Sequence, residues 1–550
     1  MSGWNFADVW EEIAVAAPGR LAQAHGARRL TWSQFDRRAN ALARHLLDAR
    51  LSHETKVAAY LTNAPEYLET YYAAFKAGLA PVNTNYRYGS EELFYLFDNA
   101  DAEAIVFHAG YAAQLEPIRA RLSKVKAWIA VADGDHPIPA WASEYESLIG
   151  DGADRVVAPW GRSGDDLLLL YTGGTTGMPK GVMWRQDDLF NVLGAGGNLL
   201  QGVPPLASPA EAGERARAPT GAFPEPSIMI AACPLMHGTA QFGAFGVLTA
   251  GGCVASLPSR SFDPIELWDE TERLGANTIS IVGNAFAQPM LEALEANPGR
   301  WDLSAMRRIG SSGVIWSHEN KQGLLRHLPA GCMLLDNFGS SEAVGLGGSV
   351  SVGGAEAQTA QFLPGPTAVV FTDDGRRVQP GSGERGLVAV SGFIPAGYYK
   401  DPEKSAQTFR VFEGQRWSVP GDYAEVAVDG TIRLLGRGSQ VINTGGEKVF
   451  PEEVEEALKT HPAVRDAVVV GVPDPRFNER ICAVVDARHA LSLAELSNHV
   501  KGRLAAYKAP RELVLAPVVR AANGKVDYKA IRAQALEALA AGHMIDMTDL

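Results

Sequence analysis

The stretch Tyr171 to Val182, YTGGTTGMPKGV, concentrates residue types that bind phosphate. Glycines allow a backbone to approach a polyanion closely, and N–H groups, hydroxyls and an ammonium suit a triphosphate. An ordinary Gly/Thr turn is the alternative, but the density of such groups favours a nucleotide site. A Walker loop is excluded, because Lys180 lies between Pro179 and Gly181 rather than before Ser or Thr. We expect phosphate contacts from Thr172, Gly173, Gly174, Thr175, Thr176, Gly177 and Lys180.

Two further segments combine groups that suit a nucleotide. Residues Asp336 to Glu342 read DNFGSSE and offer an aromatic face, hydroxyls and one terminal carboxylate. Mg²⁺ prefers few carboxylates together with phosphate oxygens, although an acidic surface turn is the alternative for this segment alone. Asp422 and Arg437 lie on either side of a predicted short hairpin. Each alone is more often a turn aspartate or a surface arginine.

Two single residues are also candidates. His237 follows a predicted buried strand in PLMHGTA, where a lone histidine is more often a satisfied core or turn residue. Lys525 follows an Asn-Gly turn in RAANGKV, and most such lysines are solvated.

These residues need a scaffold, and its first part alternates helical and strand-like patterns between about Leu30 and Gly110. Such alternation implies βαβ units around a largely parallel sheet. The expected elements are helices over 32–47 and 67–77 and strands over 56–61 and 104–107.

The predicted scaffold continues on both sides of the phosphate-binding stretch. Residues 165–170 form an apolar run of the length of a buried strand. Residues 201–226 lose periodicity and are predicted to be a surface loop or the edge of a lid rather than a helix or strand. Further strands are expected over 228–233, 278–283 and 308–313.

At 550 residues the chain is too long for one compact core. Short alternating strands predict a small β-rich subdomain over about 364–436, within an amino-terminal domain of residues 1–436. Residues 437–550 read as a small α+β domain. The predicted fold class is therefore α/β, with a large amino-terminal domain of parallel βαβ sheets and a small, mobile carboxy-terminal domain.

Composition excludes several classes of protein. The net charge of −13 argues against a general nucleic-acid binder and against electrostatic attachment to an anionic membrane. No apolar run approaches the roughly 20 residues that span a bilayer, and the first residues lack a signal-peptide pattern. The four scattered cysteines have neither zinc-ligand spacing nor a disulfide framework, which predicts reduced thiols in the cytoplasm.

The motifs, in their order along nearly the whole chain, resemble those of the adenylate-forming superfamily, which includes acyl-CoA synthetases, luciferase and peptide-synthetase adenylation domains. Segments such as YTGGTTGMPKGVMWR and GRGSQVINTGGEKVFPEEVEEAL are most similar to bacterial CoA ligases for steroid-side-chain acids. Related branches act on fatty or arylalkanoic acids. The chain departs from the family pattern where Ser312-Gly313-Val314 replaces Gly-Gly-Ala, and where Ser439 replaces a charged hinge residue.

The resemblance implies a role for each candidate. For the nucleotide, it implies that Phe338 stacks on adenine, that Ser341 contacts the α-phosphate, that Asp422 binds ribose and that Arg437 contacts ribose or phosphate. Ser312 and Gly313 would lie at the adenine site, and Asn337, Gly339 and Ser340 would also bind the nucleotide. Glu342 and Thr172 would bind Mg²⁺, and both would act in catalysis with His237 and Lys525. His237, Asn284 and Gly313 would form the acid pocket, Ser439 the hinge, and Gly445, Gly446 and Lys448 the CoA tunnel.

The implied reaction converts a carboxylic acid, ATP and CoA through an acyl adenylate to a thioester, AMP and pyrophosphate. Small and apolar residues over 236–247 and 284–286 predict a bulky, apolar acid. The alternatives are transfer of the acyl group to a separate carrier protein, a luciferase-like oxygenase and an inactive binding or scaffold protein. A homodimer is also possible.

Overall fold

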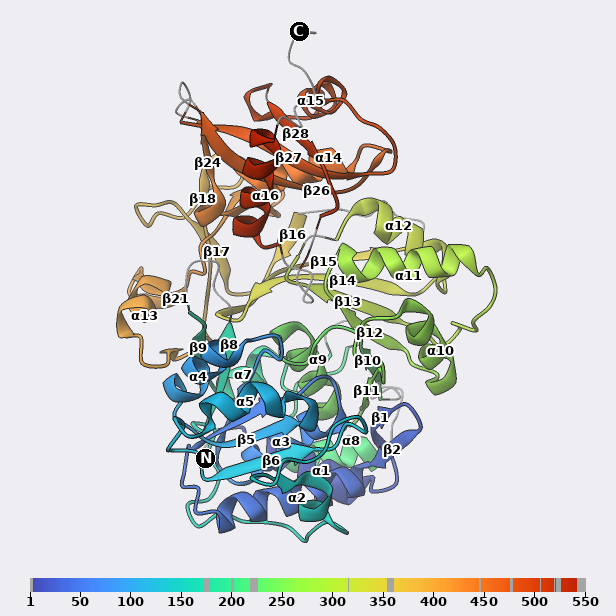
Figure 1. Cartoon of the computed structure of the whole chain (residues 1–550), viewed down its shortest axis with the longest axis vertical. Helices are drawn as coiled ribbons and strands as arrows, with labels where there is room; N and C mark the ends of the chain where they lie inside the picture. Colours follow the sequence, from blue (N-terminus) through green and yellow to red (C-terminus); the bar gives the residue numbers. More distant parts are fainter. Residues whose placement is uncertain are drawn as a thin grey trace.

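The structure is a computed structural model that describes residues 3–172, 178–198, 202–217, 226–314, 316–353, 361–444, 447–474, 478–504, 506–518, 520 and 526–541. Figure 1 shows the amino-terminal half, blue to green, below the carboxy-terminal part, which is orange to red. Within the described residues, no helix is both long enough and apolar enough to cross a membrane.

One sheet of the amino-terminal domain has eight strands in the described residues, in the order β19-β9-β8-β4-β3-β5-β6-β7. Neighbours from β8 to β7 are parallel, which confirms the βαβ prediction. Its strands are β19 (Gly397–Tyr398), β9 (Lys180–Arg185), β8 (Leu167–Thr172), β4 (Ala80–Asn83), β3 (Lys56–Tyr60), β5 (Ala102–His108), β6 (Ala127–Val131) and β7 (Ser143–Glu144). The connecting helices are α2 (Trp32–Asp48), α3 (Pro65–Lys76), α4 (Ser90–Asn99), α5 (Ala112–Arg119) and α6 (Tyr145–Ile149).

Local sequence signals explain where these helices begin. The hydroxyl of Thr31 accepts from the backbone N–H of Gln34, and the Gln34 side chain accepts from the N–H of Thr31. This capping box satisfies two backbone donors that the first turn leaves without helical partners. Helix α3 starts with Pro65, whose missing N–H costs nothing at that position.

A second sheet has fifteen strands in the described residues and changes character along its length. From β1 to β14 the neighbours are parallel, whereas from β14 onward they are antiparallel. The predicted β-rich subdomain is hydrogen-bonded into this sheet through β16 and β23. The strands are β1 (Leu21–His25), β2 (Arg28–Thr31), β10 (Ile228–Ala231), β11 (Cys253–Ser256), β12 (Thr278–Ile281), β13 (Arg308–Ser312), β14 (Met333–Ser340), β15 (Ala343–Val352), β16 (Gln361–Pro364), β17 (Ala368–Phe371), β18 (Arg385–Ser391), β20 (Phe409–Phe412), β21 (Gln415–Ser418), β22 (Asp422–Val426) and β23 (Ile432–Arg437).

Helix α9 (Gly238–Thr249) connects the two large sheets. It packs against β10, β11 and β12 of the larger sheet. On the other side, the ring of Phe242 meets Trp184 of β9 edge to face, with centroids 6.2 Å apart. The space beside α9 therefore lies between the sheets.

One expectation from the sequence is wrong. Residues 201–226 were expected to form a surface loop, but Pro209–Arg217 forms helix α8, which packs against α1 (Phe6–Ala16). Alanine, glutamate and arginine are good helix formers, and Arg215 pairs with Glu211 one turn earlier at 2.6 Å. The turn-like composition around α8 concealed it.

The carboxy-terminal part forms its own five-stranded sheet in the described residues, with apolar clusters on both faces. The change of sheet falls between Arg437 and Ile442, beside the predicted domain boundary. Its elements are β24 (Ile442–Thr444), β25 (Glu447–Val449), α14 (Pro451–Lys459), β26 (Val464–Asp474), β27 (Asn478–Ala487), α15 (Leu493–Lys501), β28 (Glu512–Leu515) and α16 (Tyr528–Ala540). Helices elsewhere in the chain are α7 (Gln186–Val192), α10 (Pro264–Leu274), α11 (Asn284–Ala296), α12 (His318–His327) and α13 (Pro402–Thr408).

Candidate active site

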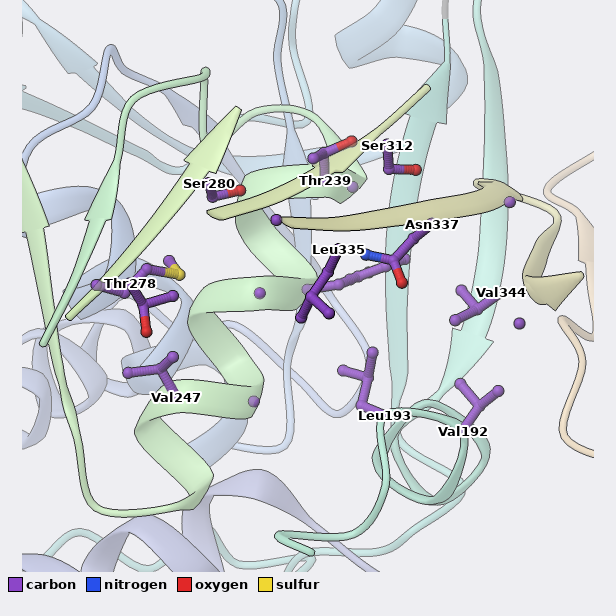
Figure 2. A pocket seen from close by; sticks show the side chains of 18 of the residues that line it. Val192, Leu193, Thr239, Val247, Thr278, Ser280, Ser312, Leu335, Asn337 and Val344 are labelled. Atoms are coloured by element: carbon purple, nitrogen blue, oxygen red, sulfur yellow. The ribbon is translucent and has the colours of Figure 1, made fainter. Parts of the chain in front are cut away.

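A cavity of about 700 Å³ lies between the two large sheets, beside α9. The ends of β8, β13 and β14 contribute Thr172, Ser312 and Ser340 to its wall, so it lies at the carboxyl ends of strands, where α/β proteins bind ligands. Figure 2 shows Ser312, Thr239 and Asn337 at one side of this cavity. The cavity brings together nine of the predicted site residues: Thr172, His237, Ser312, Gly313, Asn337, Phe338, Gly339, Ser340 and Ser341.

Strands β8 and β9 hold the ends of the phosphate-binding stretch together. Thr172 and Lys180 are partners in the antiparallel ladder, which places the two ends of this stretch side by side. Gly181 is required here, because a Cβ would lie 2.7 Å from the ring of Tyr171. The predicted residues Gly173, Gly174, Thr175, Thr176 and Gly177 lie outside the described residues.

Lys180 is paired with Asp401, which precedes α13. Hydrogen bonding by Lys180 lowers the pKa of the Asp401 carboxyl, which is therefore ionised at neutral pH. Lys180, the predicted phosphate-binding lysine, thus already has an anionic partner. A phosphate would share Lys180 with Asp401 or compete with Asp401 for it. Sequence reasoning missed Asp401.

Glu342 is fixed from two directions. The hydroxyl of Tyr398 donates to its Oε1 at 2.9 Å, and the hydroxyl of Ser418 donates to its backbone oxygen at 2.6 Å. In the described part of the chain, no three His, Cys, Asp or Glu side chains gather as metal ligands. A single positioned carboxylate fits Mg²⁺ whose remaining ligands are phosphate oxygens and water, rather than a metal held by protein ligands alone.

The end of β14 offers a hydroxyl that fits a nucleotide phosphate. Ser340 Oγ is buried and has no hydrogen-bond partner among the described residues, so a ligand oxygen would satisfy it. Next to it, the carbonyl of Ser341 accepts from the indole N–H of Trp184 at 3.0 Å. Trp184 therefore fixes this turn relative to β9, the strand that ends the predicted phosphate-binding stretch.

The predicted adenine residues lie on the same strand. Phe338 packs against Phe362 with ring centroids 5.3 Å apart, and it also borders the cavity. The Asn337 amide donates to the carbonyl of Ser311 at 3.4 Å, which ties β14 to β13. Stacking of Phe338 on adenine stays a prediction.

Asn83, at the end of β4, joins two parts of the site and was not predicted. Its side-chain amide donates to the carbonyls of Tyr171 at 2.9 Å and Met236 at 2.7 Å, and its oxygen accepts from the N–H of Tyr171. Only 3% of Asn83 is exposed. It thus ties β8 to the turn that carries His237. The only signal in the sequence is a polar residue that ends the apolar run Ala80-Pro81-Val82.

Two of the three predicted acid-pocket residues border the cavity. His237 precedes α9 and Gly313 follows β13, and both border the cavity. Gly313 has φ +89°, a conformation that a residue with a Cβ adopts only under strain. Asn284 is not among the lining residues, and its side-chain oxygen accepts from the N–H of Ser317 at 2.9 Å. Its contact with the acid stays a prediction.

Asp422 and Arg437 are ladder partners on β22 and β23, which confirms that they lie on either side of one hairpin. Asp422 is buried, whereas the side chain of Arg437 lies outside the described part. Their contacts with ribose or phosphate stay predictions.

The predicted carboxy-terminal residues are only partly described. Lys525, Gly445 and Gly446 lie outside the described residues, and for Lys448 in β25 and Ser439 only the backbone is described. Arg520 and Val526, on either side of Lys525, form an antiparallel bridge. Arg520 is anchored by two hydrogen bonds to Asp466, at 2.6 and 2.8 Å.

Known proteins resemble the chain in both sequence and structure. Residues 10–399 match the family described as AMP-binding enzyme, and residues 453–525 match the AMP-binding enzyme C-terminal domain. A medium/long-chain-fatty-acid–CoA/3-oxocholest-4-en-26-oate–CoA ligase of Mycolicibacterium smegmatis is 40% identical, over 96% of this chain and 95% of that protein. A 3-oxocholest-4-en-26-oate–CoA ligase of Rhodococcus rhodochrous is 42% identical, with the same coverage. The crystal structure of the anthranilate CoA ligase AuaEII superposes with a TM-score of 0.83 at 21% identity, covering 98% of this chain and 99% of that one, which shows the shared fold.

Proposed function

This chain belongs to the AMP-binding enzyme family, and on that premise we propose that its acid substrate is bulky and apolar, of the steroid-side-chain or fatty-acid class. The two relatives at 40% and 42% identity are both named CoA ligases, and the chain is an ATP-dependent acid–CoA ligase. Transfer to a separate carrier protein is not favoured by these relatives. The acid named for both carries an oxo group at position 3 and its carboxylate at position 26.

The observation that carries the choice of acid is the continuity of the cavity. Hydroxyl-bearing residues lie at the strand ends, and the same cavity extends along α9 past Phe242, Gly246 and Val247. An apolar space of this size suits an acid much larger than acetate. The acid's carboxylate would lie near His237, where the two regions meet.

The first step joins two anions, which repel each other unless the protein offsets their charge. A carboxylate oxygen forms a bond to the α-phosphorus of ATP while the bond to pyrophosphate breaks. We expect Lys180 and the hydroxyls of Thr172, Ser340 and Ser341 to bind phosphate oxygens, and Lys525 to bridge carboxylate and phosphate. In support, Thr172, Ser340 and Ser341 line the cavity, and Lys180 is the ladder partner of Thr172. Glu342 and Thr172 would hold Mg²⁺, which would supply positive charge to offset that of the phosphates.

The second step exchanges the oxygen of the mixed anhydride for sulfur. The thiol of CoA loses its proton and attacks the acyl carbon, and AMP leaves with the electrons of the broken C–O bond. No protein nucleophile is needed. The CoA tunnel at Gly445, Gly446 and Lys448, the hinge at Ser439 and a homodimer in the cytoplasm are further parts of this proposal.

The test separates the two steps. Purified protein receives ATP and Mg²⁺ with acetate, benzoate, medium- and long-chain fatty acids or a steroid-side-chain acid, with and without CoA. We expect pyrophosphate release with the larger acids, thioester formation only with CoA, and loss of both on chelation of Mg²⁺. Higher kcat/KM for acetate than for every larger acid would overturn the proposed substrate class.

A further inference from the structure

Arg308 begins β13 and borders the end of the cavity opposite the phosphate-binding residues. Because side chains alternate along a strand, Arg308 and Ser312 lie on the same face of β13, and both border the cavity. Ser312 belongs to the nucleotide end, and four residue steps separate it from Arg308, roughly 13 Å at the rise of a β-strand. Arg308 is thus placed to contact the far end of a long acid.

Neighbouring strands complete this distal end of the cavity. Thr278 of β12 is the register partner of both Arg308 and Met229 of β10. Figure 2 shows Thr278 and Val247 at the side of the cavity away from Ser312. The apolar side chains of Met229 and Val247 and the hydroxyl-bearing side chain of Thr278 thus line the cavity near Arg308.

The hydrogen bonds of Arg308 leave part of the guanidinium available. Nε donates to Thr278 Oγ1 at 2.9 Å, and Nη2 donates to the hydroxyl of Ser227. Nη1 has no hydrogen-bond partner among the described residues, and no described carboxylate pairs with this arginine. Burial lowers the pKa of Arg308, yet an arginine guanidinium stays charged in proteins.

A second arginine at the cavity wall shows the contrast. Arg215 pairs with Glu211 at 2.6 Å and donates to the carbonyls of Gly196, Pro204 and Pro205. Its charge is balanced and its donors bind protein oxygens. Arg308, in contrast, is a half-buried cation with only two hydroxyl partners among the described residues. Removing its charge from water costs free energy unless a further hydrogen-bond acceptor compensates, and the cavity has room for such an acceptor.

We infer that Arg308 determines substrate specificity by donating a hydrogen bond from Nη1 to a carbonyl oxygen at the end of the acid farthest from its carboxylate. This inference rests on the proposed function and narrows its substrate class to long acids with a distal oxo group. A ketone oxygen accepts from a charged donor without bringing a second charge into an apolar cavity. The distal hydroxyls of Ser227 and Thr278 hold the guanidinium in place for that contact.

The test compares two acids that differ only in the distal oxygen: a steroid-side-chain acid with a ring ketone and the same acid with that ketone reduced to methylene. For the native enzyme we expect kcat/KM to favour the oxo acid by roughly ten- to hundredfold, the range for hydrogen bonds to charged groups. The difference should lie in KM, because a distal contact is made equally in the ground and transition states.

Three variants make the result specific to Arg308. R308M should abolish the preference while the reduced acid and a plain fatty acid keep their kcat, and R308K, which retains the charge, should restore part of it. R307M is the matched control, since Arg307 is exposed and bonds the carbonyls of Ser304 and Met306. It should keep the preference. Thermal unfolding of each variant checks that the fold is intact.

Several outcomes would overturn the inference while leaving the ligase activity standing. These are equal use of both acids by the native enzyme, equal losses on both acids in R308M, or a preference for an acid with a distal carboxylate over the oxo acid. Failure of the native enzyme to activate any acid would instead refute the proposed function.

Discussion

The hydroxyl of Tyr398 donates a hydrogen bond to the carboxylate of Glu342, 56 positions earlier in the chain. Tyr398 lies on β19, which pairs with β9, so the strand that follows the phosphate-binding stretch also orients the proposed Mg²⁺ ligand. Replacing this hydroxyl should weaken Mg²⁺ binding without removing the carboxylate.

For Y398F we expect a roughly tenfold lower kcat/KM in pyrophosphate release and a higher Mg²⁺ concentration at half-maximal rate. In E342Q the kcat/KM of pyrophosphate release should fall by a factor on the order of 10²–10³, because the negative charge itself is removed. Y399F is the matched control, since Tyr399 donates to Asp101 instead. If Y398F and Y399F have the same Mg²⁺ dependence, the contact does not position the ligand.

Asn83 should matter for both stability and activity. N83A leaves buried carbonyls of Tyr171 and Met236 without their donor, which typically costs about 1–3 kcal/mol for each unsatisfied group. We expect a lower Tm and a loss of adenylation larger than the unfolded fraction explains. The control N297A removes an amide at the end of α11, away from the cavity. Full activity of folded N83A would refute a positioning role.

Gly246 of α9 borders the cavity, and a Cβ there would meet no atom within 4 Å. G246L should therefore fold and place its side chain in the cavity. Long and steroid acids should lose roughly 10- to 200-fold in kcat/KM relative to short-chain acids, the range for small steric differences in apolar pockets. G246A serves as the control and should keep the native selectivity. An unchanged chain-length profile in G246L would show that the acid binds elsewhere.

Lys525 is predicted to act in the first step alone. K525A should lower the rate of acyl adenylate formation by a factor on the order of 10²–10³, by analogy with other single electrostatic stabilisers. It should still convert supplied acyl adenylate and CoA to thioester, because the attacked carbonyl is neutral. K529A, on the exposed side of α16, is the control. Equal losses in both half-reactions by folded K525A would refute the assignment.

Glu11 should make stability depend on acid pH. Burial alone would raise its pKa, but hydrogen bonds from Arg162 and the charge of Lys76 outweigh burial and lower the pKa from 4.5 to about 2. A lowered carboxyl pKa stabilises the fold fully above pH 4.5, and this gain, about 3 kcal/mol, is lost as pH falls toward 2. Burial also lowers the pKa of Lys76, but this lysine titrates at alkaline pH and does not contribute to the change in stability at acid pH.

Urea unfolding of the native protein and E11Q at several pH values measures this effect. The difference in unfolding free energy should be largest near neutral pH and should shrink below pH 4.5. E12Q, at an exposed neighbouring position, should show no such trend. A difference that stays constant from pH 7 to pH 3 would contradict the assignment.

Sequence patterns predicted those features that depend on local periodicity or on short motifs. The strand before Thr172, the parallel βαβ order and the pairing of the segments around Asp422 and Arg437 are examples. Contacts made by single residues far apart in the chain leave no periodic signal. The sequence therefore does not predict the contacts of Asn83, Tyr398 and Asp401 at the site, and for Arg308 it predicts only the start of a strand.

The direction of β13 has a consequence for how the substrate specificity of such an enzyme can evolve. Ser312, at its carboxyl end, borders the part of the cavity proposed to bind the nucleotide, and Arg308, at its amino end, borders the part proposed to bind the end of the acid that takes no part in bond making. Because the hydrogen-bonded register keeps these ends at a fixed separation, we expect a substitution at one end to leave the geometry of the other intact. Single substitutions at the amino end of β13 could thus change which acid is bound while the residues that act on the phosphate stay in place.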